Sequence, residues 1–494
     1  MISDGTMEEG TIDFQPLFYP KTLAVIGASK NPVGAVKYVK AHLNTGIRIY
    51  PVNKNPEITE LEGLTVYRSI LDIEEDIDLC VIGVPKEYVA DVIEDFKKKT
   101  VKFAVIFTSG FKENGREDLE QAVRNKISEV STRFVGPNCL GIYNPRSGLV
   151  YFPEWPSNDE VAGNVAFISQ SGGHTAKTNM FLMSRKVFFS KTISIGNAID
   201  LKPYDFLPYF KDDPETSVVA MYIESATDGR QFMDALKKIT PVKPVIIWKG
   251  GQGNTGFKAT ASHTGELAGN FKLWQSMGKQ TGTIIAEDFD TFTDLLTLFS
   301  FNVPLLKDLR VAIVACGGGN AVETADIFEA GGFKIPELSE ETKQRIGEFI
   351  PDINSSFTNP VDLGEYGYVP EYFAKAVEIV ANDENIDAVV YIKESARFKH
   401  FSVNFLMSEE QYAEASVNTL KETHARNAAS RNIPLIMNDP YISEDIEGYT
   451  FRSSFRNELA KYGIPVFGRI DVLMRAIKKG YEYGKFLERN RSEI

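Results

Sequence analysis

The sequence predicts an α/β protein made of three successive domains, each built around a parallel β-sheet. Short apolar runs alternate with amphipathic stretches of helix length, which is the pattern of parallel α/β domains. Three times, such a run leads directly into a turn of small residues and then into a helix-like segment. With 494 residues, the chain also exceeds the roughly 250 to 300 residues at which one hydrophobic core stops growing. We expect domains over residues 1–150, 151–302 and 303–494.

The apolar runs and their punctuation place the elements in order. The clearest candidate strands are residues 23–26, 79–84 and 103–107 in the first domain, 165–168, 218–223 and 245–248 in the second, and 311–315, 388–392 and 434–437 in the third. A proline-rich loop at residues 152–156 follows the first domain, and a helix over residues 291–299 closes the second. Asn302-Val303-Pro304 is the expected linker, and a final helix starts at Asp471.

Composition and charge exclude several classes of protein. The 43% hydrophobic and 24% charged residues are typical of a globular protein, and no apolar run approaches the ~18 residues of a membrane span. The polar, acidic opening does not resemble a signal peptide, and three widely spaced cysteines suit neither a disulfide framework nor a zinc site. We therefore expect a cytoplasmic protein that does not bind a membrane or a metal.

The net charge of −13 argues against nucleic acid as a partner, because binding a phosphate backbone needs a basic face. Small anions remain compatible with this charge. Backbone amides at helix N-termini can hold them whatever the overall sign of the protein.

The first small-residue turn resembles a dinucleotide fingerprint without its full glycine spacing. It contains Gly27 and Ser29, and the next strand leads to Asn53 and Lys54. An NAD-binding domain usually offers an acid there to the ribose hydroxyls, whereas a lysine suits a phosphorylated nucleotide such as coenzyme A (CoA). The alternative is a tight turn with solvated polar residues.

Two further turns could approach an oxyanion without a Cβ in the way. Ser171, Gly172 and Gly173 follow the strand that ends at Ile168, and Gly318 and Gly319 follow the strand that ends at Ala315. On packing grounds alone, structural strand-to-helix turns explain both equally well.

His263 lies in a long loop of small residues, after the glycine-rich residues 250–256. A single loop histidine is more often merely exposed. Glu224, however, ends the strand at residues 218–223 and could hold one imidazole nitrogen, leaving the other as a nucleophile.

Seven short segments in this order resemble the nucleoside-diphosphate-forming acyl-CoA synthetase family, relatives of succinyl-CoA synthetase. The segments are Ala24-Val25-Ile26-Gly27-Ala28-Ser29, Tyr50-Pro51-Val52-Asn53, Ser109-Gly110-Phe111-Lys112-Glu113, Gly136-Pro137-Asn138-Cys139-Leu140-Gly141, Ser169-Gln170-Ser171-Gly172, Ile195-Gly196-Asn197 and Ala261-Ser262-His263-Thr264-Gly265. The resemblance covers nearly the whole chain. It implies a Rossmann-like CoA-binding domain followed by two flavodoxin-like domains.

The resemblance also implies site residues. His263 would carry a phosphoryl group, and Glu224 would orient it. Helix N-termini at Ser171, Gly172, Gly173, Gly318 and Gly319 would hold the phosphate. CoA would bind along Gly27, Ser29, Asn53, Lys54, Val84, Pro85, Asn138 and Cys139, with the last two near its thiol.

The implied reaction is carboxylate plus CoA plus ATP giving acyl-CoA, ADP and phosphate, through an acyl phosphate. No segment resembles the family's ATP-grasp domains, so we expect an α subunit of a hetero-oligomer whose ATP-grasp β subunit binds ATP or ADP with Mg. The chain departs from the family at Gly173-His174-Thr175, which leaves His174 as either a second phosphoryl acceptor or a substrate contact. His42, His400 and His424 are expected in surface segments.

Two alternatives differ in class. A non-catalytic CoA-sensing or scaffold protein of the same fold has no reason to keep both Glu224 and His263. An NAD-dependent oxidoreductase is disfavoured by the missing third fingerprint glycine and by Asn53-Lys54 in place of an acid.

Overall fold

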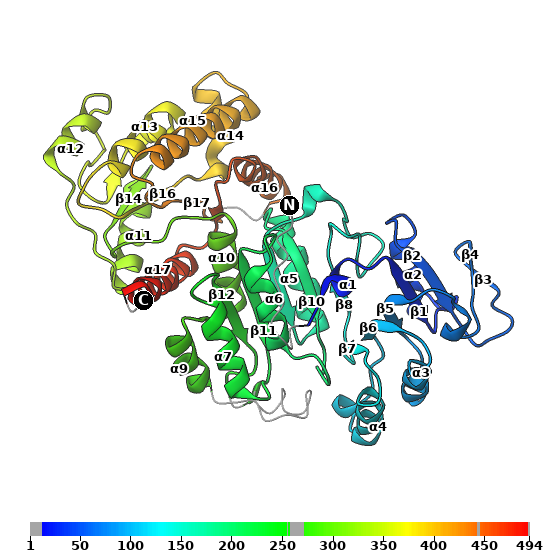
Figure 1. Ribbon diagram of the computed structural model, residues 1–494. Helices are drawn as coiled ribbons and strands as arrows, with labels where there is room; N and C mark the ends of the chain where they lie inside the picture. The colour runs from blue at the N-terminus through cyan, green and yellow to red at the C-terminus, as the bar shows by residue number, and fades with distance from the viewer. Residues whose placement is uncertain (1–11, 254, 257–270, 442–444, 493–494) are drawn as a thin grey trace. The chain divides into compact units, whose positions relative to one another are not determined.

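The computed structural model describes residues 12–253, 255–256, 271–441 and 445–492. The chain divides into two compact units, which are described separately. The first comprises the residues up to Phe181 together with Phe188–Glu287, and the second comprises Leu182–Val187 and the residues from Asp288 onward. The first unit contains two large sheets, and the second unit contains the third (Figure 1).

The three large sheets consist mainly of parallel strands. In spatial order, the first sheet is β2 (Arg48–Val52), β1 (Thr22–Ile26), β5 (Ile77–Ile82), β6 (Val101–Ile106) and β7 (Arg133–Val135). The second is β13 (Ile284–Ala286), β12 (Val245–Lys249), β11 (Val218–Ile223), β9 (Val165–Ser169), β10 (Phe189–Ser194) and β8 (Gly141–Tyr143). The third is β15 (Val361–Asp362), β14 (Val311–Ala315), β16 (Ala388–Ile392), β17 (Leu435–Asn438) and β18 (Val466–Phe467). A small hairpin, β3 (Glu60–Leu61) with β4 (Leu64–Thr65), accompanies the first sheet.

All three sheets share one strand order. Numbered along the chain within each sheet, the parallel strands lie in the order 2-1-3-4-5, and only β8 runs antiparallel, beside β10. In a sheet of this order the connections leave to opposite sides after strands 1 and 3, which opens a crevice between the carboxyl ends of those strands. The order confirms the predicted α/β class and fixes where each sheet can bind a ligand.

The predicted strands form because helices cover both faces of each sheet, so their central residues are continuously apolar. Every residue of β1, β5, β9, β11, β14 and β16 is buried. The helices of the first unit, α5 continuing beyond it, are α1 (Gln15–Phe18), α2 (Val36–His42), α3 (Val89–Asp95), α4 (Glu117–Ile127), α5 (Gly172–Ser184), α6 (Leu207–Asp212), α7 (Gly229–Ile239) and α9 (Phe271–Thr281).

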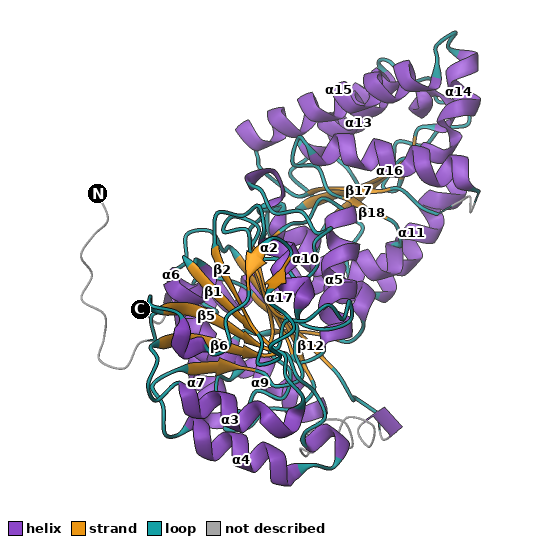
Figure 2. Ribbon diagram, turned by 90° about the vertical axis from the view of Figure 1, so that its right-hand side faces the viewer, coloured by secondary structure: helices purple, strands orange, loops and turns teal. Residues whose placement is uncertain are grey.

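The helices of the second unit are α10 (Phe289–Ser300), α11 (Gly318–Ala330), α12 (Glu340–Gly347), α13 (Pro370–Ala381), α14 (Phe398–Asn404), α15 (Glu409–Ala429), α16 (Ile446–Ala460) and α17 (Ile470–Ser492). Helices α13 and α15 lie side by side (Figure 2). Local sequence sets several of the helix starts: Asp288 caps α10 by accepting the Thr291 amide at 2.7 Å, and Ser408 with Gln411 forms a capping box on α15.

Two elements bear on where the domains end. Residues 141–143, within the first predicted domain, form β8 of the second sheet. Helix α10, the predicted last helix of the second domain, packs against α17 within the second compact unit. The boundaries near residues 150 and 303 stay a prediction.

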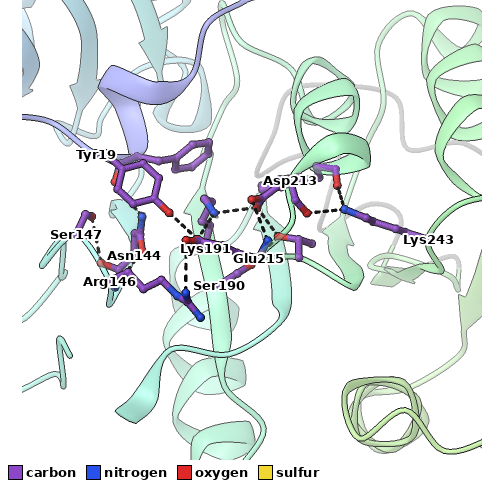
Figure 3. A network of polar contacts seen from close by, with 12 residues as sticks. Tyr19, Asn144, Arg146, Ser147, Ser190, Lys191, Asp213, Glu215 and Lys243 are labelled. Carbon is purple, nitrogen blue, oxygen red and sulfur yellow. Dashed lines mark hydrogen bonds and ion pairs between the residues drawn. The ribbon is translucent and has the colours of Figure 1, made fainter. Parts of the chain in front are cut away.

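A buried charge network joins the N-terminal segment to the second sheet (Figure 3). The fully buried ammonium of Lys191 on β10 lies 2.8 Å from Asp213 Oδ2 and 2.8 Å from Glu215 Oε2. Tyr19 donates its hydroxyl to Glu215 Oε2 at 2.5 Å, and Thr216 donates to Asp213 Oδ2 at 2.7 Å. Each carboxylate therefore receives a second donor besides the buried ammonium of Lys191.

Candidate functional site

A cleft of about 1500 Å³ runs along the carboxyl ends of the strands in the first unit. Its lining comes from both sheets of that unit: the turns after β1, β2, β5 and β6 of the first sheet, and the turns after β9, β10 and β11 of the second. The cleft is larger than the 300 to 1,000 Å³ usual for drug-sized ligands, so it suits an extended one.

The crevice of the first sheet lies between the ends of β1 and β5. Gly27 follows β1 with φ of +86°, and a Cβ there would lie 2.7 Å from the carbonyl oxygen of Gly83, which follows β5. A Cβ on Gly83 would in turn lie 2.5 Å from the Cβ of Ala35. The two glycines therefore let the strand ends and α2 approach closely, with Gly27, Gly83 and the predicted Ser29 lining the cleft.

Asn53 and Lys54 lie at the end of β2 and line the same cleft. Asn53 donates its side-chain amide to the Ala28 carbonyl at 2.7 Å, which ties the end of β2 to the turn after β1. Lys54 is exposed, so its ammonium is free to meet an anionic ligand. Arg68, which the sequence did not single out, donates to the carbonyls of Asn53 and Pro56 and holds this loop in place.

Val84, Pro85, Asn138 and Cys139 line the cleft farther along. The Thr108 hydroxyl donates to Val84 O at 2.7 Å, and the Thr108 carbonyl accepts the Asn138 amide at 2.9 Å, so these turns hold one another. Burial raises the pKa of the Cys139 thiol to about 12. Cys139 is therefore a protonated wall residue at neutral pH, not a nucleophile.

The junction between the two sheets brings several of the quoted motifs together. A Cβ on Gly196 would lie 2.1 Å from the Pro137 carbonyl oxygen, and the Asn197 amide donates to that carbonyl at 2.9 Å. The Asn197 side chain donates to Glu113 Oε2 at 2.7 Å. These contacts tie the Ile195-Gly196-Asn197 segment to the turn at Pro137 and to Glu113.

The crevice of the second sheet lies between the ends of β9 and β11, where the sequence placed Ser171 and Glu224. Ser171, Gly172, Gly173 and Glu224 all line the cleft. Gly172 and Gly173 begin α5, and the first amides of a helix have no acceptor within it. Among the described residues, the nearest atom that a Cβ on Gly173 would meet is Ser171 Oγ at 3.9 Å, so these residues leave space there for a ligand.

Glu224 is held from three sides. Gln170 Oε1 accepts the backbone amides of Glu224 at 2.6 Å and Ser225 at 3.1 Å. The Tyr222 hydroxyl donates to the Glu224 carboxylate at 3.1 Å, and the Lys249 ammonium donates to the Glu224 carbonyl at 2.7 Å. The bond from Tyr222 thereby fixes one carboxylate oxygen at the edge of the cleft, and among the described residues none donates to the second oxygen, Oε2.

Gln170 and Lys249 are positioning residues that the sequence analysis missed. Lys249 is 1% exposed, and burial lowers its pKa to about 8. Gln170 belongs to the quoted Ser-Gln-Ser-Gly segment, which was the available signal, whereas Lys249 ends an apolar strand and gave none.

His263 lies outside the described residues. Gly318 and Gly319 begin α11 in the second unit. There the Asp362 carboxylate accepts the amides of Gly317 and Gly364, each at 2.9 Å, so a carboxylate already lies beside this turn. A phosphate at Gly318 and Gly319 would have to tolerate that charge, and this assignment stays a prediction.

The expectation that His42 is a surface residue is wrong. His42 is 2% exposed; its Nδ1 lies 2.6 Å from the Tyr38 carbonyl, and its Nε2 accepts the Val150 amide at 3.2 Å. His424 is partly covered, with its Nε2 2.8 Å from the Tyr391 hydroxyl, and His400 is exposed. None of the three lines the cleft.

Among the described residues, no group of three or more His, Cys, Asp and Glu side chains is arranged to hold a metal ion. The helices in the described ranges include none that is long and apolar enough to cross a membrane.

Comparison with known proteins finds a family model for each of the two large sheets in the first unit. A model of CoA binding domains matches residues 21–145, and a model of succinyl-CoA-ligase-like flavodoxin domains matches residues 162–299. The α subunit of the ADP-forming acetate–CoA ligase II of Pyrococcus furiosus is 34% identical over 92% of this chain and 94% of its own length. The ADP-forming acetate–CoA ligase I of Archaeoglobus fulgidus is 36% identical over 76% of this chain but 54% of its own length.

A solved structure covers nearly the whole chain. The dinucleotide forming acetyl-coenzyme A synthetase 1 of Ca. Korarchaeum cryptofilum, in complex with phosphate and ADP, is 28% identical with a TM-score of 0.82, over 98% of this chain and 99% of its own. Fold and cleft thus define a CoA-binding α/β subunit of an acid–thiol ligase. The chain belongs to the ADP-forming acetate–CoA ligase family, in the arrangement of its α subunits. This membership supports the catalytic interpretation over the CoA-sensing or scaffold alternative.

Proposed function

We propose that this chain is the CoA-binding, phosphohistidine-carrying subunit of an ADP-forming acyl-CoA synthetase, with His263 as the phosphoryl carrier. A single cleft carries the proposal, because it joins the CoA-type turns at Gly27, Lys54 and Asn138 to the turn at Ser171–Gly173 and to Glu224. A CoA molecule that begins at Lys54 and follows the first sheet would end its thiol arm near the start of α5. Thioester chemistry and phosphate chemistry would then meet in one place.

The residues of the cleft fit CoA in size and in chemistry. Gly27 and Gly83 let the ends of β1 and β5 approach closely beside the cleft, and the exposed Lys54 supplies positive charge for the phosphates of CoA. Asn138 and the protonated thiol of Cys139 offer neutral polar contacts where a free thiol would lie. The carboxylates of Glu87, Asp91 and Asp95 also line the cleft and would repel phosphates. We therefore place the phosphates at Lys54 and away from α3.

The reaction proceeds in three balanced steps. An imidazole nitrogen of His263 attacks the γ-phosphorus of ATP, and ADP leaves. A carboxylate oxygen of the acid then attacks the phosphorus on His263, which forms the acyl phosphate and frees the imidazole. Finally the CoA sulfur attacks the acyl carbon, the carbon–oxygen bond to phosphate breaks, the thiol proton is lost, and acyl-CoA and phosphate remain. Every step is reversible.

This chain's described residues serve the second and third steps. Glu224 accepts a hydrogen bond from one nitrogen of His263 through the oxygen that Tyr222 leaves free, and so keeps the other nitrogen nucleophilic. The amides at Ser171–Gly173 stabilise the phosphoryl oxygens where negative charge develops. Gly318 and Gly319 are the proposed second phosphate contact.

The nucleotide belongs to a partner in this proposal. An ATP-grasp β subunit binds ATP or ADP with Mg, and the two subunits form a hetero-oligomer. The match to the A. fulgidus ligase, which covers 76% of this chain and 54% of that protein, supports a fused equivalent of the missing part. The proposed protein is cytoplasmic, and its substrates are a small carboxylic acid, CoA and phosphate.

Reconstitution tests the proposal. The purified chain alone should bind CoA in calorimetry but form no thioester from ATP, CoA and a panel of short-chain carboxylic acids. Adding the cognate ATP-grasp subunit should restore thioester formation with at least one acid. Thioester formation by the chain alone would contradict the divided enzyme, and a chain that does not bind CoA would contradict the use proposed for the cleft.

A further inference from the structure

His174 has a distinctive position in the cleft. It is the third residue of α5, directly after the two glycines of the proposed phosphate site, and its side chain lines the cleft. Its ring centroid lies 4.5 Å from that of Tyr222 and 4.7 Å from that of Trp248, while those two rings are 4.7 Å apart. Three aromatic rings from α5, β11 and β12 therefore form one cluster beside Glu224.

The two ring nitrogens of His174 lie in different surroundings. Nδ1 is buried and has no hydrogen-bond partner among the described residues. Of the two nitrogens, Nε2 is therefore the one that a ligand in the cleft can reach. An anion accepts only from a nitrogen that carries the proton, so a bound anion selects the neutral tautomer with the proton on Nε2 and the lone pair on Nδ1.

The surroundings also keep the ring neutral. Burial, and then the positive charge of Lys177 one turn along α5, lower the pKa of His174. The N-terminus of α5 adds partial positive charge at the same place. Glu224 carries the negative charge nearby. Its carboxylate already accepts a hydrogen bond from Tyr222, and the cationic Lys249 donates to its carbonyl. A neutral imidazole can still donate a hydrogen bond, and it adds no further positive charge beside Lys177 and the N-terminus of α5.

We propose that neutral His174 donates Nε2–H to an anionic oxygen of the phosphoryl or acyl group held at the start of α5. The proposal rests on the proposed function, because it needs an anion at Ser171–Gly173. It assigns His174 as a substrate contact and excludes it as a second phosphoryl acceptor, since an acceptor must become cationic where the surroundings disfavour the cation. Tyr222 and Trp248 hold the ring in the orientation that presents Nε2 to the cleft.

Replacing His174 with glutamine or with phenylalanine distinguishes a hydrogen-bond donor from a side chain that only fills the space. The side-chain amide of His174→Gln can donate from a place close to Nε2, whereas His174→Phe fills the ring site and donates nothing. Calorimetry of the full chain with saturating CoA would measure the dissociation constants of inorganic phosphate and, separately, of acetate. We expect His174→Gln to stay within about threefold of the wild type and His174→Phe to weaken binding about tenfold or more. His400→Phe, on an exposed helix, is the control and should change nothing.

The two titrations identify which oxygen His174 contacts: a loss confined to phosphate indicates the phosphoryl group, and a loss confined to acetate indicates the acyl group. Equal weakening in both His174 variants, no weakening in either, or no binding of either anion to the wild type would overturn the proposal. CoA binding in the same samples reports on the proposed function independently.

Nitrogen chemical shifts of the wild-type histidines give a second test that needs no variant to fold. With phosphate bound at pH 7, His174 should be neutral with its proton on Nε2. An imidazolium, or a proton on Nδ1, would overturn the proposal.

Discussion

Replacing Lys191 with methionine should destabilise the protein strongly, although Lys191 lies outside the cleft. Methionine keeps most of the volume and removes the ammonium that lies 2.8 Å from both Asp213 and Glu215. The carboxylate of Asp213 is 4% exposed and that of Glu215 is 22% exposed, so water cannot replace the lost charge at Asp213. The variant therefore leaves the Asp213 carboxylate without the ammonium that pairs with it in the core, while Glu215 keeps Arg146 at 3.6 Å.

The expected loss follows from that geometry. Removing one partner of a buried ion pair costs about 3 to 5 kcal/mol, because the remaining charge is uncompensated. Here the lower end applies, since Thr216 still donates to Asp213 and Tyr19 still donates to Glu215. A loss of about 3 kcal/mol should lower the melting temperature by roughly 5 °C if the first compact unit unfolds as a whole.

Scanning calorimetry and urea unfolding of the full chain would measure this loss. Lys211→Met is the matched control, because Lys211 is 41% exposed and its ion pair with Asp212 is long, at 4.0 Å. This variant should therefore lose less than about 1 kcal/mol of stability. Adding Asp213→Asn to Lys191→Met should restore part of the stability. A loss below about 1 kcal/mol for Lys191→Met, or a further loss in the double variant, would refute this reasoning.

Two other predictions concern the cleft and the response to pH. Lys54→Glu should weaken CoA binding about tenfold or more without changing the melting temperature. Lys40→Glu, outside the cleft, should leave CoA binding unchanged. Equal dissociation constants for Lys54→Glu and the wild type would remove Lys54 from the site. Burial lowers the pKa of His42 to about 4, below its unfolded value of about 6.5. Between these pH values the unfolded chain binds a proton that the folded chain does not, so His42 makes stability fall by about 3 kcal/mol as the pH decreases through that window. His42→Asn should show a shallower decrease in urea unfolding, and an unchanged pH slope would contradict the assignment.

The sequence predicted the strands well because buried parallel strands are continuous apolar runs. The predicted strand at residues 218–223 coincides with β11, and most of the others differ at their ends by one or two residues. The turn residues could also be predicted from the sequence, because glycines such as Gly27 mark places where backbones approach closely. Both signals can be recognised within a short stretch of sequence.

Other features depend on which segments become neighbours. Gln170 binds the backbone of Glu224 because β9 pairs with β11, a fact that no local pattern contains. His42 was expected at the surface, but Val150, 108 residues away, covers it. Similarly, the surroundings of His174 depend on Tyr222 and Trp248, which come from two different strands.

Phosphorylation of His263 is the most direct test of the central claim. The purified chain, incubated with an acyl phosphate or with acyl-CoA and labelled inorganic phosphate, should acquire an acid-labile, base-stable phosphoryl group. His263→Asn should acquire none, and Glu224→Gln should fold but react more slowly, because an amide cannot stabilise the positive charge that builds on the attacking imidazole. His400→Asn should be labelled like the wild type. Label that persists in His263→Asn and disappears in His174→Asn would contradict both the assignment of the carrier and the neutral role of His174.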